Sequence, residues 1–160
     1  MLFRSHAKIL RSPHAHARIR RIDTSRAEAL AGVHAVCVGA ELPTPYGVIP
    51  WTPDENALAV GKVRFVGDGV AAVAAISEEV AAAACKLIEV DYELLPALTT
   101  PEAALAQSEV KIHEGNKHGN VTKHVQLAFG DVDAALAEAE LLIEGHYQFH
   151  GSTHAPLEPH

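Results

Sequence analysis

Residues 11–36 have the sequence RSPHAHARIRRIDTSRAEALAGVHAV, which combines a strand, a helix and a second strand in one short unit. Pro13 separates two stretches with strand character, residues 7–12 and 15–22, because proline cannot donate a ladder hydrogen bond. Beyond residue 22 the spacing of apolar residues changes to a helical one. Strand and helix alternate so closely here that we predict a layer of helices packed on a sheet.

The helix and the strand that complete this unit have recognisable boundaries. Asp23 or Thr24 can cap the start of the helix, and Gly32 is placed to end it. Residues 33–38 are then predicted as a strand whose odd-numbered side chains face one way and whose even-numbered side chains face the other. The following crossing, residues 41–56, contains four prolines and is predicted to be extended and irregular.

An apolar region follows the crossing. Residues 63–66 and 70–76 are predicted to be the most buried strands, with a bulge or tight turn at residues 67–69 (GDG) between them. Ser77 is a good N-cap for a helix that runs to about Leu87, and two glutamates follow it at the positive end of the helix dipole. The alanines of this helix permit close packing on the sheet.

The sequence changes character past residue 108. A strand over residues 88–94 and a short helix opened by Thr100 and Pro101 complete the first region, and HEGNKHGN at residues 113–120 is polar and rich in glycine. We therefore expect a first domain over residues 1–108, a linker over residues 109–120 and a further segment over residues 121–160. In that segment we predict a strand, a helix and a long strand, over residues 121–129, 132–139 and 141–149.

Composition narrows the classes of function. A chain of 160 residues with 48% apolar content is long enough for one domain, or for one domain and part of the next. The formal net charge of -7 argues against a nucleic-acid partner, because phosphates attract clustered lysine and arginine. The apolar N-terminus is interrupted by charge, and no run of 18 apolar residues occurs. We therefore expect a cytoplasmic chain without a signal peptide or a membrane partner.

Cysteine and histidine residues do not form a convincing metal site in this sequence. Cys37 and Cys85 lie far apart with no CxxC spacing, which favours two buried thiols. His146, His150 and His154 are spaced four residues apart, but neighbouring glycines and prolines disfavour a helix. On a strand the first two would be about 13 Å apart, which is too far for one ion. A surface or interface role is therefore favoured over a metal.

Three other features have competing interpretations. His14 and His16 lie close together, but two ligands make an incomplete metal site. Asp54 and Glu55 could act as an acid and base pair, yet adjacent residues of an extended segment point apart. Solvated loop charges or a subunit contact are the favoured interpretation of these two. Trp51 is either a core plug or an interface anchor.

Five short motifs together resemble a known family. They are SPHAHARI at 12–19, ID at 22–23, GV at 32–33, RFVGD at 64–68 and VA at 70–71. With residues 129–160, they resemble the large, molybdenum-binding subunit of the xanthine oxidase and aldehyde oxidoreductase family. The resemblance implies an α+β fold: an α/β hammerhead domain, with a mixed sheet and packed helices, followed by the first β-α-β elements of the molybdenum-cofactor-binding domain.

Within that family, residues 51–56 (WTPDEN) and 67–70 (GDGV) are most similar to the 4-hydroxybenzoyl-CoA reductase α subunit. Gly69 stands where much of the wider family has a proline. This similarity implies reductive dehydroxylation of 4-hydroxybenzoyl-CoA to benzoyl-CoA, with electrons from ferredoxin. One alternative is another molybdenum hydroxylase, similar to xanthine or aldehyde dehydrogenase. A second alternative is a stand-alone binding or assembly module without catalysis.

The resemblance also implies cofactors and partners outside this chain. A molybdenum-pterin cytosine dinucleotide would lie in the full subunit, and iron-sulfur clusters and FAD would lie on an iron-sulfur small subunit and a flavin medium subunit. Self-association into a homo-oligomer stays open. None of the residues that the family uses to hold the pterin or to catalyse lies before His160. We therefore assign no catalytic, cofactor-binding or metal-ligating residue, and expect the chain to be inactive alone.

Overall fold

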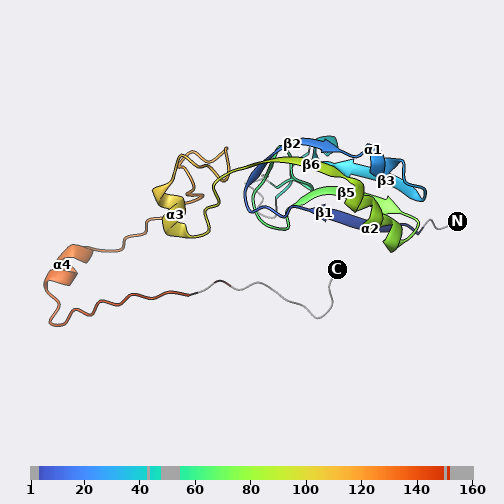
Figure 1. The fold of residues 1–160 in the computed structure, drawn as a ribbon. Helices are drawn as coiled ribbons and strands as arrows, with labels where there is room; N and C mark the ends of the chain where they lie inside the picture. The colour runs from blue at the N-terminus through green and yellow to red at the C-terminus, as the bar shows by residue number, and fades with distance from the viewer. Residues whose placement is uncertain (1–3, 43, 48–54, 150, 152–160) are drawn as a thin grey trace. The chain divides into compact units, whose positions relative to one another are not determined.

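The computed structural model describes residues 4–42, 44–47, 55–149 and 151. The chain divides into two compact units, Met1–Thr122 and Lys123–His160 (Figure 1). The first unit contains both sheets and the buried core. None of the helices in the described part of the chain is long and apolar enough to span a bilayer.

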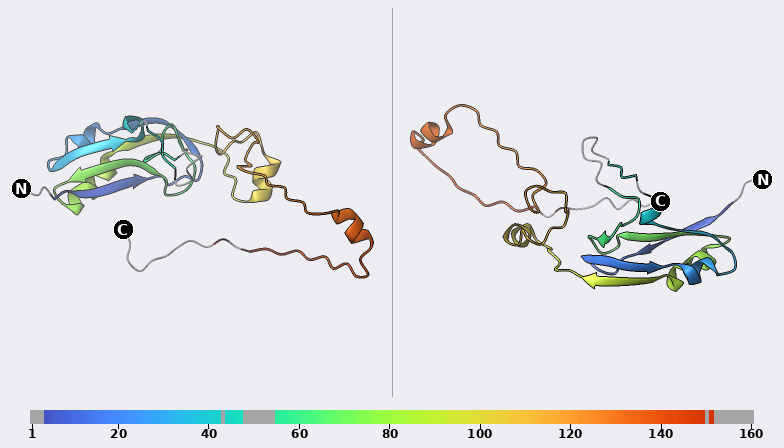
Figure 2. Two further views of the ribbon diagram at one scale, coloured as in Figure 1. Left: turned by 180° about the vertical axis from the view of Figure 1, so that it is seen from behind. Right: turned by 90° about the horizontal axis from the view of Figure 1, so that it is seen from above.

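The first sheet is built around a strand of small residues. β5 (Gly69–Ala75) lies between β1 (His6–Arg11) and β3 (Val33–Val38), and both pairings are antiparallel (Figures 1 and 2). The sequence of β5, GVAAVAA, combines β-branched valine with alanine and glycine. Such side chains suit a central strand because neighbouring elements can approach it closely.

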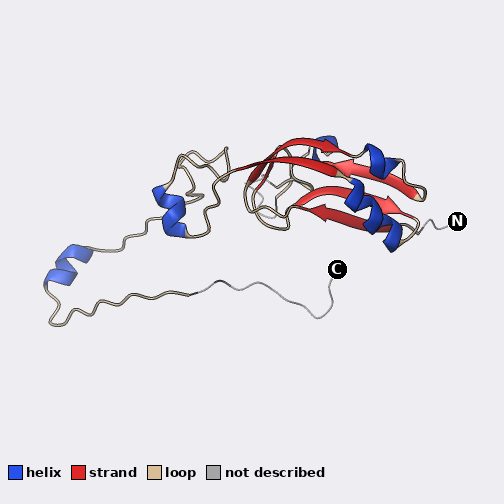
Figure 3. Cartoon of the chain, viewed as in Figure 1, coloured by secondary structure: helices blue, strands red, loops and turns tan. Residues whose placement is uncertain are grey.

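The second sheet has β2 (Ala17–Asp23) between β4 (Lys62–Val63) and β6 (Glu89–Leu94). Figure 3 draws the strands in red and the helices in blue. Successive strands along the chain alternate between the two sheets. We expected a mixed sheet, and the structure corrects this expectation: every pairing between the described strands is antiparallel.

The helix that follows β5 confirms its prediction. α2 (Glu78–Leu87) begins after Ser77, whose Oγ accepts a hydrogen bond from the Val80 N–H at 3.3 Å. The earlier helix is shorter than predicted, because α1 (Ser25–Glu28) is a single turn that ends well before Gly32. Gly32 has a φ of 92°, which suits a turn and not a continuing helix.

A core of small side chains joins α1, α2 and β5. Its buried members are alanine, valine, cysteine and isoleucine, which lets the helices lie close to the sheet. They are Ala27, Ala71, Val73, Ala75, Ala81, Ala84, Cys85 and Ile88. A second cluster, formed by Ala17, Ala59, Val63 and Val70, joins β5 to the second sheet.

β3 has the predicted limits but not the predicted division of its side chains. A bulge lies between Val33 and Ala35, where the pairing with β5 shifts. Because the extra residue changes which face each side chain takes, Val33 packs against the core together with Val36 and Val38. The simple alternation of odd and even positions is therefore wrong for this strand.

The strand predicted over residues 63–66 is also shorter in the structure. β4 ends at Val63, which is fully buried, whereas Phe65 and Val66 are 59% and 66% exposed. Gly67 has a φ of 95°, and the chain turns here before it enters β5. The predicted turn is confirmed, but it begins earlier than the apolar residues suggested.

The later elements agree in part with the sequence. α3 (Pro101–Ala106) has Thr100 as its N-cap and Pro101 as its first residue, as predicted. A short 3-10 helix, η1 (Gly39–Glu41), follows β3. In the second unit α4 (Val132–Ala137) follows Asp131, whose Oδ1 accepts the Ala134 N–H at 3.0 Å.

No strand is assigned to residues 123–129 or 141–149. The two strands predicted there are therefore wrong for these ranges. A strand is defined by the backbone hydrogen bonds that it exchanges with a neighbouring strand. The expected domain limits at residues 108 and 120 stay a prediction.

Candidate functional site

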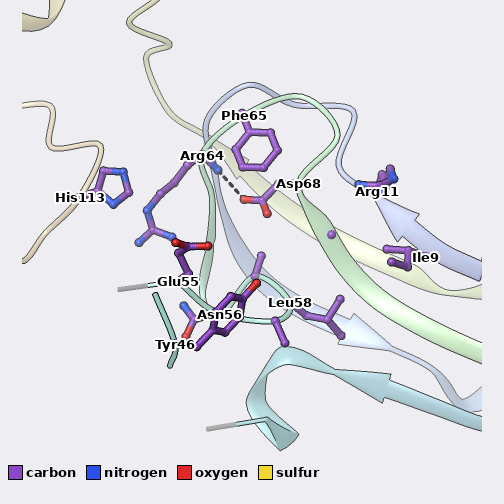
Figure 4. Close-up of a pocket in the computed structure, with 13 residues that line it drawn as sticks. Ile9, Arg11, Tyr46, Glu55, Asn56, Leu58, Arg64, Phe65, Asp68 and His113 are labelled. Atoms are coloured by element: carbon purple, nitrogen blue, oxygen red, sulfur yellow. Dashed lines mark hydrogen bonds between the residues drawn. The ribbon is translucent and has the colours of Figure 1, made fainter. Parts of the chain in front are cut away.

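A pocket of about 320 Å³ opens beside the end of β1 (Figure 4). Five parts of the first unit line it: β1, Tyr46, residues 55–59, the turn that leads into β5, and His113. Tyr46 and Glu55 form an antiparallel bridge with two backbone hydrogen bonds of 2.8 Å. The bridge holds these two residues side by side at the edge of the pocket.

The turn at residues 64–69 is fixed by hydrogen bonds to β1 and to itself. The Asp68 carboxylate accepts the Arg64 backbone N–H at 3.1 Å (Figure 4). Ser12 donates its backbone N–H to the Asp68 carbonyl, and its own carbonyl accepts the Gly67 N–H, both at 2.8 Å. The turn therefore holds Phe65 outward in a defined position, beside the pocket.

The two arginines that line the pocket, Arg11 and Arg64, donate hydrogen bonds to other parts of the chain. Arg11 donates to the Gly67 carbonyl at 2.8 Å. Arg64 donates from Nε to the Ile112 carbonyl at 3.0 Å and from Nη2 to the Glu114 carboxylate at 3.2 Å. These contacts favour a structural surface over a catalytic one, because each guanidinium already has a partner within the chain.

Next to this pocket, Lys62 is a buried charge. It is 5% exposed, and its Nζ donates to the Lys111 carbonyl at 2.8 Å and forms an ion pair with Glu114 at 2.5 Å. Partial burial opposes ionisation of Glu114, but the hydrogen bond from Lys62 and the nearby charges of Lys62 and Arg64 outweigh it, so its pKa falls to about 2. Glu114 is therefore ionised at any physiological pH.

His16 is another buried polar residue near these elements, at 5% exposure. Its Nδ1 lies 2.7 Å from the Pro96 carbonyl, and because a carbonyl only accepts, Nδ1 carries the proton. Nε2 has no partner among the residues that the structure describes. His16 borders two further pockets, of about 280 and 350 Å³. The His14 ring instead packs edge-on against the ring of Tyr92, with the two ring centroids 4.9 Å apart.

The cysteines are not placed for chemistry. Cys85 is buried and Cys37 is half-buried, and both are free thiols. Burial raises the pKa of both thiols, and the charge of Glu41 adds to the effect at Cys37. A raised pKa leaves less reactive thiolate, so neither residue is a favoured nucleophile.

The sequence-based metal candidates are not brought together by the described structure. His146 is exposed in the second unit, and within the described ranges no three His, Cys, Asp or Glu side chains are grouped to hold a metal ion. Four residues of the sequence analysis lie outside the described residues: Trp51, Asp54, His150 and His154. The expectation that residues 1–160 hold no catalytic or cofactor-binding residue stays a prediction.

Sequence reasoning missed Lys62, Arg64 and Glu114 as a group. Nothing in the sequence joins Lys62 to Glu114, since they lie in different predicted elements and far apart along the chain. The only available signal is a lysine and an arginine on either side of a buried valine, which alternation would place on the solvent face.

Comparison with known proteins identifies the family. Residues 2–96 match the family described as aldehyde oxidase and xanthine dehydrogenase, a/b hammerhead domain. This chain belongs to that family. The match covers β1 to β6, which are the two sheets and the core described above. The fold class expected from the motifs is thereby confirmed.

Relatives within the family are much longer than this chain. The xanthine dehydrogenase molybdenum-binding subunit of Escherichia coli O157:H7 is 37% identical in an alignment 163 positions long, which covers 96% of this chain and 21% of the relative. The carbon monoxide dehydrogenase large chain of Afipia carboxidovorans is 38% identical in an alignment 164 positions long, which covers 93% of this chain and 20% of the relative. The chain thus spans about a fifth of the length of these curated relatives.

A solved structure gives the same picture. The quinoline 2-oxidoreductase of Pseudomonas putida 86 superposes with a TM-score of 0.58 at 44% identity, over 63% of this chain and 14% of that chain. The family-level resemblance in the motifs is confirmed, and the chain belongs to a family of oxidoreductases that contains molybdenum enzymes.

Proposed function

We propose that this chain is the N-terminal portion of the large, molybdenum-binding subunit of a molybdenum hydroxylase. The observation that carries the proposal is the family match over residues 2–96, together with relatives that align over almost the whole chain and extend well beyond it. In this assignment the first unit is a scaffold at the front of the subunit, and the chemistry belongs to the remaining polypeptide.

The described residues do not fit a molybdenum-pterin site of their own. They offer no cluster of metal-binding side chains, and both arginines at the pocket are engaged with the chain itself. We therefore derive no catalytic step from these residues. Their role is to hold the fold and to present surfaces to the rest of the enzyme.

Metal analysis tests the proposal. The 160-residue chain and a longer chain that continues through the downstream coding sequence are purified from the same host, and molybdenum is measured by inductively coupled plasma mass spectrometry. We expect molybdenum to accompany only the longer chain. Stoichiometric molybdenum in the 160-residue chain would overturn the proposal, and so would a stop codon directly after His160 in an intact gene, which would favour a stand-alone binding module.

For the substrate, we propose the 4-hydroxybenzoyl-CoA reductase branch. The sequences of residues 51–56 and 67–70 support it, and Gly67 has a φ of 95°, which suits glycine at that position. The reaction would remove the ring hydroxyl as water, using two electrons and two protons, with reduced ferredoxin as electron donor. Benzoyl-CoA formation by the complete enzyme is the expected result. Oxidation of xanthine or an aldehyde instead would assign another branch.

We also propose that partner subunits carry the electron-transfer cofactors. The term "large chain" in the name of the carbon monoxide dehydrogenase relative supports an assembly of several subunits. An iron-sulfur small subunit and a flavin medium subunit are the expected partners. Affinity purification of the tagged full-length subunit from its native host should recover both, with visible absorption of flavin and iron-sulfur clusters. Recovery of the subunit alone would contradict this assembly.

A further inference from the structure

Residues 109–121 lie against the first unit through a set of side-chain contacts. The Lys62 Nζ donates a hydrogen bond to the Lys111 carbonyl at 2.8 Å. The Arg64 Nε donates one to the Ile112 carbonyl at 3.0 Å. Both cations also pair with Glu114, at 2.5 Å and 3.2 Å. The side chains of Lys62 and Arg64 therefore contact three residues, Lys111, Ile112 and Glu114, of the segment that the sequence predicts to be a linker.

Asn120 holds the other end of the same segment. Its Nδ2 donates to the Ala104 carbonyl at 2.9 Å and to the Val110 carbonyl at 3.1 Å, and its Oδ1 accepts the Ile112 N–H at 3.0 Å. One amide side chain therefore links α3 to two points of the segment. We name the group of Lys62, Arg64, Glu114 and Asn120 the clasp.

We infer that the clasp makes residues 109–121 a fixed part of the first unit instead of a flexible linker. The number of contacts that must break together is the reason that the clasp stays closed. If the segment left, Lys62 and Arg64 would each lose a carbonyl acceptor and their shared anionic partner, and Asn120 would lose the Ala104 carbonyl.

The clasp also completes the pocket beside β1. His113 lines that pocket and lies between Ile112 and Glu114, the two residues that Arg64 binds (Figure 4). Arg64 itself belongs to the turn that forms another wall of the pocket. Closing the clasp therefore sets the position of one pocket wall relative to another. This inference rests on contacts within the chain and does not depend on the proposed function.

Limited trypsin digestion of the full 160-residue chain tests the inference. Lys111 and Lys117 lie within the clasped segment and Lys123 lies at the start of the second unit, and all three side chains are exposed, so the three sites differ in how the backbone is held. We expect cleavage after Lys123 to be at least about tenfold faster than cleavage after Lys111 or Lys117, because cleavage requires local opening. Equal rates at the three sites would overturn the inference.

A pair of charge-matched variants gives the second arm of the test. Glu114→Gln removes the anion of the clasp, and Glu109→Gln removes the same charge from an exposed position five residues earlier. We expect Glu114→Gln to speed cleavage after Lys111 and Lys117 about fivefold, with Lys123 unchanged, and Glu109→Gln to change none of the three rates. Identical behaviour of the two variants would overturn the role of Glu114.

Hydrogen exchange supplies a readout that needs no substitution. The Ile112 N–H is bonded by Asn120, so its exchange in the unmodified chain should be much slower than that of the amides at residues 124–129. Comparable exchange in both places would show that the segment is loose and would contradict the clasp.

Discussion

At the scale of single residues, Lys62 and Glu114 are unequal partners. The Lys62 side chain is 7% exposed and the Glu114 side chain is 62% exposed. Removal of the carboxylate leaves an ammonium group in a poorly solvated position, whereas removal of the ammonium leaves a carboxylate that water and Arg64 still reach. The two halves of this ion pair should therefore contribute differently to stability.

We predict that Glu114→Gln lowers the free energy of unfolding by about 1–2 kcal/mol, less than for a fully buried pair because Glu114 is largely exposed. Lys62→Met keeps the apolar stem and removes the buried charge, so we expect a loss below about 1 kcal/mol. Urea denaturation of both variants measures the two free energies. A larger loss for Lys62→Met would contradict this account.

The titration of Glu114 is a second residue-scale prediction. Its pKa is lowered from 4.5 to about 2, so the folded state binds the proton less readily than the unfolded state. The stabilisation is fully present above pH 4.5 and is lost as the pH falls from about 4.5 towards about 2. Carboxyl-carbon NMR should give a lower midpoint for Glu114 in the folded chain than in the urea-unfolded chain. A Glu114 midpoint near 4.5 would show that the ion pair is not formed.

At the scale of elements, the end of β4 has a direct test in two valines. Val63 is fully buried and Val66 is 66% exposed, although both lie in one apolar run of the sequence. We predict that Val63→Ala costs about 2 kcal/mol of unfolding free energy through lost burial and a cavity, and that Val66→Ala costs less than about 0.5 kcal/mol. Thermal and urea unfolding measure both losses. Similar losses would mean that the strand continues through Val66.

Elements with strong local signals were predictable from the sequence. α2 has an N-cap at Ser77 and alanines that suit close packing, and β5 is a continuous run of small apolar residues. The length of α1, the end of β4 and the bulge in β3 were not predictable, because each depends on a partner element. The clasp could not be predicted from the sequence for the same reason, because its four residues come together only when the chain has folded.

At the scale of the whole molecule, the two units differ in how they bury apolar side chains. The buried core lies entirely in the first unit among the described residues. In the extended segments of the second unit large apolar side chains are exposed, mostly at alternate positions, as expected for segments that lack a partner. They are Val125, Leu127, Phe129, Leu141, Leu142, Ile143, Tyr147 and Phe149.

We predict that a polypeptide ending at Thr122 unfolds within about 2 °C of the full 160-residue chain, because every buried core residue of the described part of the chain lies before residue 122. Differential scanning calorimetry of both measures the midpoints. The shorter polypeptide should also be more soluble, since it lacks the exposed apolar side chains of the second unit. A large fall in the midpoint would mean that the second unit supports the core.

The core of alanine and valine has a consequence for the entropy of folding. Alanine has no side-chain rotamers to lose, and valine is already restricted by its branched β-carbon, so ordering these side chains costs little entropy. Each also removes only a small apolar area from water, and so contributes little individually. The first unit is therefore stabilised by many small contributions from apolar burial, each with a small cost in side-chain entropy. A longer side chain at Ala81 or Ala84 would have to find both space and a single rotamer.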